Sequence, residues 1–232
     1  MFKAVFWDND GTLMDTESMF YHLSAEILSR INIHLTKEFF TNSFLKTGGS
    51  TFDRARQQGV SEEIISQLRE QKKQLEQEWL QTKTLPVFPG IREILEALQG
   101  QVLMAVVTNS SNHVLDIKFQ RTGLAKYFDF SITSDDYTFE KPHPEPYLLA
   151  IKQSGFHPHE CVAIEDTEKG VISAKKAGLT CFAIPNEFSA GNDFCLADRI
   201  FSSAEELLSQ KYLILPEQKE VERTSHPTNI LT

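Results

Sequence analysis

The chain has 232 residues, of which 41% are hydrophobic and 24% charged, as in ordinary folded proteins, and this length suits one large domain or a domain with an insert. Its formal net charge is −9 and its pI is about 5.3, so it lacks the basic excess with which proteins attract nucleic acids or anionic membranes. We therefore expect no nucleic-acid partner and no membrane association.

Signals for targeting and for disulfides are weak as well. The apolar runs, of which residues 102–107 are a long example, fall far short of the ~20 residues of a membrane-spanning helix. Asp8 interrupts the first apolar run before it could form the core of a signal peptide. The three cysteines are an odd number without a CxxC pair. We expect a reduced, cytoplasmic protein that is a monomer or a weak dimer.

Five short apolar runs predict strands, at residues 3–7, 102–108, 130–133, 161–165 and 180–184. Most are unbroken rather than alternating, which is typical of strands buried on both faces of a parallel sheet. Helical patterns lie between them, at residues 91–98, 113–121, 146–154 and 169–177. Strands that alternate with helices indicate an α/β core with a mainly parallel sheet.

The stretch between the first two predicted strands is much longer than the others and contains helical patterns at residues 16–32, 36–46 and 61–82. Ser61 is placed to cap the last of these helices, with two acidic residues in its first turn. Prolines at 86 and 89 end the stretch. We expect a core domain of residues 1–15 and 89–211, a helical insert of residues 16–88, and a C-terminal tail of residues 212–232 without assigned chemistry.

Two carboxylates follow the first predicted strand, in the segment Asp8-Asn9-Asp10-Gly11-Thr12. Open α/β sheets bind ligands at the carboxyl ends of their strands, and Gly11 permits a sharp turn there. So close a pair of acids either shares a proton or holds a hard cation. An EF-hand loop starting at Phe6 is a rival interpretation, but phenylalanine offers no oxygen ligand and the preceding residues predict a strand rather than a helix.

Polar residues also follow the later strands. Thr108-Asn109-Ser110 follows the second, Lys141 lies in a proline-rich turn, and Glu165-Asp166 ends the fourth. Each has an ordinary structural explanation, as a turn or helix cap for Thr108-Asn109-Ser110 and Asp166, and as a solvated surface side chain for Lys141. Their order at successive strand ends instead favours a single site with four carboxylates, a cation and neutral hydrogen-bond donors.

Together, Asp8-Asn9-Asp10-Gly11-Thr12, Thr108, Lys141 and Glu165-Asp166 resemble the four ordered motifs of the haloacid dehalogenase (HAD) superfamily, over residues 3–184. This resemblance implies a Rossmann-like, three-layer core. The helical insert directly after the first motif resembles the subclass with a small α-helical cap domain, within the phosphatase and β-phosphoglucomutase-like branch.

The resemblance also implies roles for these residues. Asp8 would be the nucleophile that forms an aspartyl-phosphate, and Asp10 the general acid and then the general base. Thr108 and Lys141 would hold the phosphoryl oxygens with help from Asn109, and Gly11 and Thr12 would also contact the substrate. Mg²⁺ would bind Asp8, the backbone carbonyl of Asp10, Asp166 and Glu165, and would relieve the repulsion between carboxylate and phosphate.

The expected activity is therefore Mg²⁺-dependent hydrolysis of a small phosphomonoester, such as a sugar phosphate or similar metabolite. A sugar phosphomutase is the first alternative. Mutases of this branch carry an arginine in the cap for the second phosphate, but Thr51 stands at that place, and Arg54 and Arg56 are out of register. This difference favours hydrolysis. The second alternative is a catalytically idle binding protein, which the complete set of motif residues disfavours.

Overall fold

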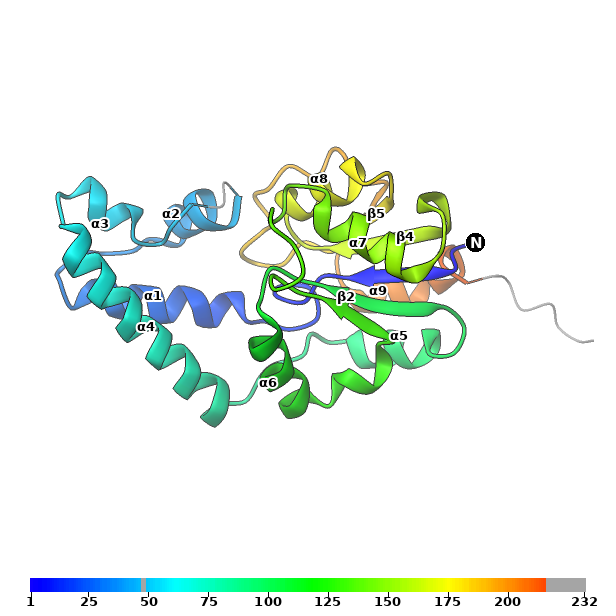
Figure 1. Cartoon of the computed structure of the whole chain (residues 1–232), viewed down its shortest axis with the longest axis horizontal. Coiled ribbons are helices and arrows are strands. Elements are labelled where there is room, and N and C mark those ends of the chain that lie inside the picture. The colour runs from blue at the N-terminus through cyan, green and yellow to red at the C-terminus, as the bar shows by residue number, and fades with distance from the viewer. Residues whose placement is uncertain (47–48, 216–232) are drawn as a thin grey trace, which may run out of the picture.

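Six parallel strands form one sheet in the order β3-β2-β1-β4-β5-β6 in the computed structural model, which describes residues 1–46 and 49–215 (Figure 1). They are β1 (Ala4–Trp7), β2 (Leu103–Val107), β3 (Phe130–Ile132), β4 (Cys161–Glu165), β5 (Thr180–Ala183) and β6 (Arg199–Ile200). This order is typical of the Rossmann-like α/β fold. The five predicted strands are confirmed, and β6 is an additional edge strand of two exposed residues.

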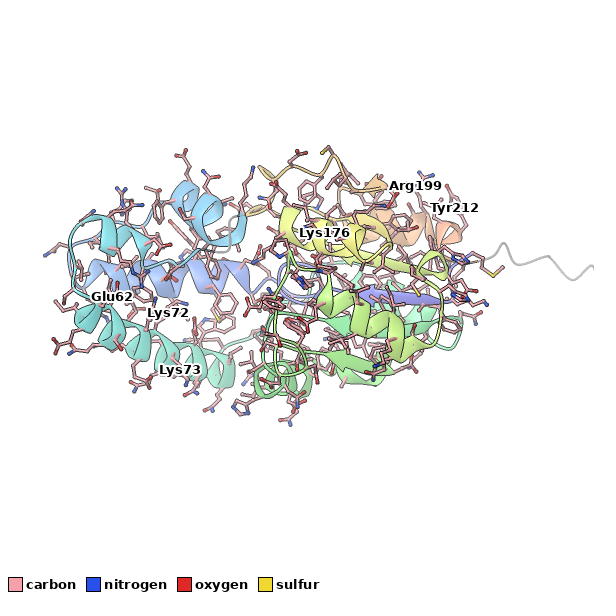
Figure 2. The ribbon with its side chains drawn as sticks, turned by 45° about the horizontal axis from the view of Figure 1, so that its top comes forward. Glu62, Lys72, Lys73, Lys176, Arg199 and Tyr212 are labelled. Carbon is pink, nitrogen blue, oxygen red and sulfur yellow. The ribbon has the colours of Figure 1, made fainter. Side chains whose placement is uncertain are left out.

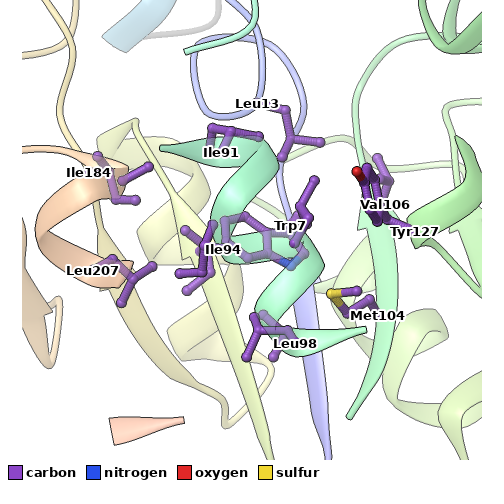
Figure 3. Close-up of a cluster of buried hydrophobic side chains, with 14 of the residues drawn as sticks. Trp7, Leu13, Ile91, Ile94, Leu98, Met104, Val106, Tyr127, Ile184 and Leu207 are labelled. Atoms are coloured by element: carbon purple, nitrogen blue, oxygen red, sulfur yellow. The ribbon is translucent and has the colours of Figure 1, made fainter. Parts of the chain in front are cut away.

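Helices cover both faces of this sheet. Because successive side chains of a strand point to opposite faces, Val5 and Trp7 of β1 join one hydrophobic cluster whereas Ala4 and Phe6 join the other. Figure 3 shows the first cluster, in which Trp7 lies among side chains of the neighbouring strands and helices. Its helices are α5 (Ile91–Leu98), α6 (Asn112–Thr122) and α9 (Ala204–Ser209), and those on the other face are α7 (Glu145–Ser154) and α8 (Glu168–Lys176). The three-layer α/β architecture is thus confirmed, and burial on both faces explains why the central strands β1, β2, β4 and β5 are predominantly apolar.

Shorter helical turns complete the core, at Leu124–Tyr127 (η2), Pro158–Glu160 (η3) and Lys211–Leu213 (η4). The last turn brings Ile214 into the core, where it is fully buried and its carbonyl accepts a hydrogen bond from the backbone N–H of Phe2 (3.3 Å). The chain therefore still packs on the core at residue 214, beyond the point where we expected a tail to start. Residues 216–232 of that tail lie outside the described part of the chain.

The segment between β1 and α5 is helical. It contains α1 (Glu17–Ser29), α2 (Lys37–Phe40), the π-helical turn η1 (Thr41–Lys46), α3 (Asp53–Gln57) and the long helix α4 (Glu62–Thr82). Ser61 caps α4, because its hydroxyl accepts a hydrogen bond from the backbone N–H of Ile64. The five residues of α3 are too few to form a periodic pattern, so the sequence did not predict this helix. None of the helices in residues 1–46 and 49–215 is long and apolar enough to cross a membrane.

The helical insert, defined here as residues 16–88, has its own hydrophobic cluster around Ile27, Phe40 and Ile65. Its two connections to the core run side by side, since the N–H of Asp15 donates to the carbonyl of Pro86 (3.0 Å) and that of Phe88 to the carbonyl of Leu13 (3.1 Å). This neck starts at the turn that follows β1. The insert consequently lies over the carboxyl end of the sheet.

Candidate active site

Three neighbouring strands bring the predicted residues to one edge of the sheet. The strand β1 lies between β2 and β4, with Trp7 in register with Val106 and Ile164, so the residues that follow these strands meet. The N–H of Asp8 donates to the carbonyl of Ile164 (2.9 Å), which continues the sheet by one residue. Asp8, Thr108 and Asp166 all line one cavity at this edge.

Lys141 links two of the predicted carboxylates at the bottom of this site. Its Nζ lies 2.6 Å from Asp8 Oδ1 and 2.6 Å from Glu165 Oε1, and it also donates to the carbonyl of Val107 (2.7 Å). Burial by itself would lower the pKa of Lys141, but the two carboxylates raise it above its ordinary value. Lys141 is therefore a buried, permanently charged ammonium that holds the predicted nucleophile in place.

Negative charge exceeds positive charge around Asp8. Burial, together with the neighbouring carboxylate of Glu165, raises the pKa of Asp8 to about 7 against the opposing effect of Lys141. Burial and the neighbouring carboxylates of Glu17 and Asp8 raise the pKa of Asp166 well above its usual range. A divalent cation would remove this excess.

The donor set fits such a cation. One oxygen atom from each of Asp8, Glu165 and Asp166 lies within 4.8 Å of the others, and all three residues are buried. Oε2 of Glu165 is buried without a hydrogen-bond partner among the described residues. Three clustered carboxylates with an unsatisfied oxygen suit a hard cation such as Mg²⁺. Glu165 does not line the cavity, so it lies beneath the site rather than facing a substrate.

The turn after β1 packs directly against Asp166. Gly11 has a φ of +85°, and a Cβ there would lie 2.2 Å from Asp166 Oδ2, so only glycine fits. The hydroxyl of Thr12 donates to Asp166 Oδ1 (3.1 Å), and the side-chain amide of Asn186 donates to Oδ2 (2.8 Å). Gly11 and Thr12 do not line the cavity. They pack against the carboxylate cluster, and their expected contact with the substrate remains a prediction.

The Asp10 carboxylate does not join the cluster of Asp8, Glu165 and Asp166 but contacts Lys118, Thr16 and Ser110. Burial by itself would raise its pKa, but the buried ammonium of Lys118, with hydrogen bonds from Thr16 and Ser110, lowers the pKa of Asp10 to about 2. The Ser110 hydroxyl lies 2.8 Å from Asp10 Oδ2. Asp10 is thus ionised at neutral pH and lies on the wall of the cavity rather than in the carboxylate cluster.

The residues after β2 also line the cavity. The Thr108 hydroxyl accepts a hydrogen bond from the N–H of Ser110 (3.1 Å), so this turn is closed by its own side chain. Oδ1 of Asn109 accepts hydrogen bonds from the hydroxyl of Tyr137 (2.9 Å) and the N–H of Lys141 (3.4 Å). These contacts fix the Asn109 amide beside the Lys141 loop.

The cavity has a volume of about 210 Å³, and the helical insert forms part of its wall. From the insert come a buried acid and three hydrophobic side chains, namely Glu17, Phe20, Phe44 and Leu45. Burial raises the pKa of Glu17 to about 8, in spite of its hydrogen bond with Asn186 and the charge of Lys169. A small polar molecule with one apolar side fits this enclosure.

Several charged and polar residues of this site were not predicted from the sequence, among them Glu17, Lys118, Tyr147, Lys169 and Asn186. Glu17 directly follows Asp15-Thr16, so its nearness to the first motif was a usable signal. The others lie within helices or, for Asn186, just after β5, where such residues are common and no pattern distinguishes them.

Comparison with known proteins identifies the family. A model described as haloacid dehalogenase-like hydrolase matches residues 5–184, and the chain belongs to this family. It falls within the phosphatase and β-phosphoglucomutase-like branch, so the sequence-based resemblance is confirmed and the protein is a phosphatase-family hydrolase.

Individual relatives cover most of the chain. Hexitol phosphatase B of Escherichia coli is 28% identical over 226 residues, which are 90% of this chain and 96% of that protein. A phosphorylated carbohydrates phosphatase of Thermotoga maritima is 29% identical over 182 residues, 76% of this chain and 82% of the relative. One similar solved structure is that of the CbbY mutant D10N from Rhodobacter sphaeroides in complex with xylulose-(1,5)bisphosphate. It is 25% identical to this chain with a TM-score of 0.75, and the match covers 89% of this chain and 96% of CbbY.

Proposed function

We propose that this protein is a Mg²⁺-dependent phosphatase that hydrolyses a small phosphomonoester, such as a sugar phosphate or a similar metabolite, through an aspartyl-phosphate at Asp8. The observation that carries the proposal is the buried arrangement of Asp8, Lys141 and Asp166 at the bottom of a small cavity that the insert helps to form. Relatives named as hexitol and phosphorylated carbohydrate phosphatases support the substrate class.

Each residue has a role that its surroundings support. The Asp8 carboxylate attacks phosphorus and forms a new P–O bond while the bond to the leaving alcohol breaks. Lys141 holds Asp8 in line and offsets the charge of the phosphoryl oxygens, to which Thr108 and Asn109 donate hydrogen bonds. Asp8, Glu165, Asp166 and the backbone carbonyl of Asp10 would hold Mg²⁺, which when bound neutralises the phosphate charge.

Asp10 serves both half-reactions. Its carboxylate must first carry a proton to the leaving oxygen, and the nearby charge of the phosphate favours the protonated form by repulsion. In the second half-reaction the same carboxylate takes a proton from the water that attacks the aspartyl-phosphate. The ionised Asp10 of the resting structure is already in the form that this second step needs.

The test measures phosphate release from 4-nitrophenyl phosphate and from a panel of hexose, hexitol and pentulose phosphates, with Mg²⁺ or with EDTA. Release should depend on Mg²⁺, and Asp8→Asn should lower kcat by roughly 10⁴-fold or more because the nucleophile is lost. Acid-quenched enzyme should carry one phosphoryl group at Asp8 by mass spectrometry. Asp15→Asn is the matched control, since Asp15 lies on the same segment but does not line the cavity, and it should retain activity. Full activity of Asp8→Asn would contradict the covalent mechanism.

The mutase alternative requires a second phosphate clamp. In the described residues, the insert supplies no arginine or lysine to the cavity wall. Thr51 is buried, Arg56 pairs with Asp53 and Glu62, and Lys72 and Lys73 lie on α4 outside the cavity (Figure 2). A mutase would isomerise a sugar phosphate in the presence of a bisphosphate primer without net phosphate release, and an idle binding protein would turn over no phosphate ester in the panel.

A further inference from the structure

A lysine is buried directly behind Asp10, although nothing in the four motifs requires one. The side chain of Lys118, in the middle of α6, has no exposed surface, and its Nζ contacts Asp10 Oδ1. The same ammonium lies 3.3 Å from Ser110 Oγ and 5.7 Å from the ring centre of Phe20 in the insert. Burial of an unpaired charge costs much free energy, so the ion pair with Asp10 is what allows a charged lysine at this buried position.

The contacts of Asp10 divide between its two oxygens. Oδ1 accepts from Thr16 and Lys118, and Oδ2 accepts from Ser110 (2.8 Å) and Asn9 (3.2 Å). Lys118 is the only charged group among these four donors. About a fifth of the Asp10 side chain remains exposed on the cavity side. The carboxylate is therefore fixed from behind by an ion pair while it faces the substrate space.

We propose that Lys118 is a positioning residue for catalysis, which holds the Asp10 carboxylate at the cavity wall in the orientation that proton transfer requires. The inference rests on the proposed function, since it deepens the role of Asp10. The transferred proton moves from Asp10 to the leaving oxygen as the P–O bond breaks, and later from water to Asp10 as the aspartyl-phosphate is hydrolysed.

A purely structural role would not need the charge. The neighbouring buried positions of α6 carry Leu115, Phe119 and Thr122, so an apolar side chain can pack at residue 118, although Lys118→Met should lower stability because it leaves the Asp10 carboxylate without its ion-pair partner. A methionine has a similar length and could pack against Phe20. If Lys118 served packing alone, Lys118→Met would change the free energy of unfolding and leave the chemistry of the folded enzyme intact.

The test compares Lys118→Met with the unmodified enzyme, both saturated with Mg²⁺. We expect kcat for a sugar phosphate to fall roughly 10- to 100-fold with little change in KM. This loss is smaller than the whole rate enhancement of about 10²–10⁴-fold from general acid–base catalysis, because Asp10 itself is retained. With 4-nitrophenyl phosphate, whose leaving group needs little protonation, the first half-reaction should survive while the second slows. The variant should then release a burst of one 4-nitrophenolate per active site, followed by slow turnover.

Two further variants complete the design. Lys3→Met is the matched control, because Lys3 also pairs with a carboxylate (Glu160, 2.6 Å) and lies over an aromatic ring (Phe156, 5.6 Å), but at the opposite end of β1. It should keep kcat. Lys118→Arg retains the cation and should recover part of the activity lost in Lys118→Met, and it also serves as the test protein if the methionine variant does not fold.

Several results would overturn the inference. The inference is wrong if Lys118→Met keeps kcat within twofold on both substrates. It is also wrong if a crystal structure of this variant shows Asp10 in an unchanged orientation. If both Lys118 variants lose activity equally without a burst, the lysine is merely structural. If the unmodified enzyme releases no phosphate from any substrate in the panel, the proposed function fails and this inference falls with it, whereas an active enzyme that tolerates Lys118→Met contradicts only the inference.

Discussion

At Glu165, one carboxylate oxygen accepts two hydrogen bonds while the other accepts none. Oε1 lies 2.6 Å from Lys141 Nζ and 2.5 Å from the hydroxyl of Tyr147, whereas Oε2 has no partner among the described residues. A Cβ at Gly170 would lie 1.9 Å from Oε2, so the first turn of α8 leaves room for this carboxylate only because residue 170 is glycine. The orientation of a predicted cation ligand thus depends on a tyrosine and a glycine that bind neither cation nor substrate.

Tyr147→Phe tests this dependence. The variant removes a single hydroxyl, and the buried Glu165 keeps only Lys141 as a donor, so we expect the free energy of unfolding to fall by about 1–3 kcal/mol. The Mg²⁺ concentration for half-maximal activity should rise roughly tenfold, because second-layer partners orient metal ligands. Urea unfolding and a Mg²⁺ titration of phosphate release measure the two effects. An unchanged Mg²⁺ requirement would mean that Glu165 does not contribute to the cation site.

The motif residues and their partners differ in how far the sequence reveals them. Asp8 and Asp166 were predictable because each directly follows a predicted strand and parallel strands place their carboxyl ends together, whereas Lys141, in a proline-rich turn, was predicted from its order among the four motifs. Lys118 and Tyr147 were not, because a lysine in mid-helix and a tyrosine on an apolar helix face are ordinary. Only the three-dimensional packing of α6 and α7 against the strand ends gives these two side chains a charged partner.

The edge strand β6 pairs with β5 although its sequence has no hydrophobic pattern. In β6 both residues are exposed, so the alternation that predicts strands is absent. Just before it, Asp198 accepts hydrogen bonds from the N–H of Cys181 (2.8 Å) and from Lys175 (2.6 Å), and its own N–H donates to the carbonyl of Cys181. The Asp198 side chain therefore adds to the backbone pairing that holds β6 beside β5.

Asp198→Asn tests this contact, because the contribution of Asp198 to the free energy of unfolding should depend on pH. Although partial burial raises the pKa of Asp198, the hydrogen bonds from Lys175 and Cys181 lower it overall. A lowered pKa adds stability above the unfolded value of about 3.9, and this stability is lost as the pH falls through the folded value. At pH 7 the variant should be less stable by about 0.5–1 kcal/mol, a small effect because the pair is partly exposed, and the difference should vanish as the pH falls below the folded pKa of Asp198.

Urea unfolding of both proteins from pH 7 to pH 3 measures that difference. Lys175→Met provides the control, since without its cation the effect of Asp198→Asn at pH 7 should shrink. A difference that stays constant across this pH range would show that the charge of Asp198 does not stabilise the edge strand.

Over the whole molecule, the insert and the core meet through a core loop as well as through the neck. Asn186, after β5, donates to Asp166 (2.8 Å) and to Glu17 of the insert (2.8 Å). Two residues later, Phe188 is buried in the hydrophobic cluster of the insert, with its ring 5.7 Å from that of Tyr21 and 5.8 Å from that of Phe40. The same short segment therefore contacts Asp166, a predicted cation ligand, and the insert.

The helical insert itself was predictable from the sequence, because three helical patterns interrupt the regular strand spacing and prolines end the interruption. Its docking was not predictable. Phe188 is one of 17 phenylalanines, and its segment follows a strand like any other loop, so no periodic pattern connects it with residues 21 and 40. Contacts between segments so distant in sequence follow from the fold rather than from local propensity.

Phe188→Ala should separate docking from folding. Loss of the ring opens a hole between loop and insert, and we expect the free energy of unfolding to fall by about 3 kcal/mol. Since the insert supplies Glu17, Phe20 and Phe44 to the cavity, weaker docking should raise KM for a sugar phosphate several-fold more than it lowers kcat. Tyr212→Ala, which removes an exposed aromatic ring at the far end of the core (Figure 2), should change neither quantity. If Phe188→Ala lowers the stability but leaves KM unchanged, the prediction is wrong. The loop would then contribute packing between core and insert, and substrate binding would not depend on the docked insert.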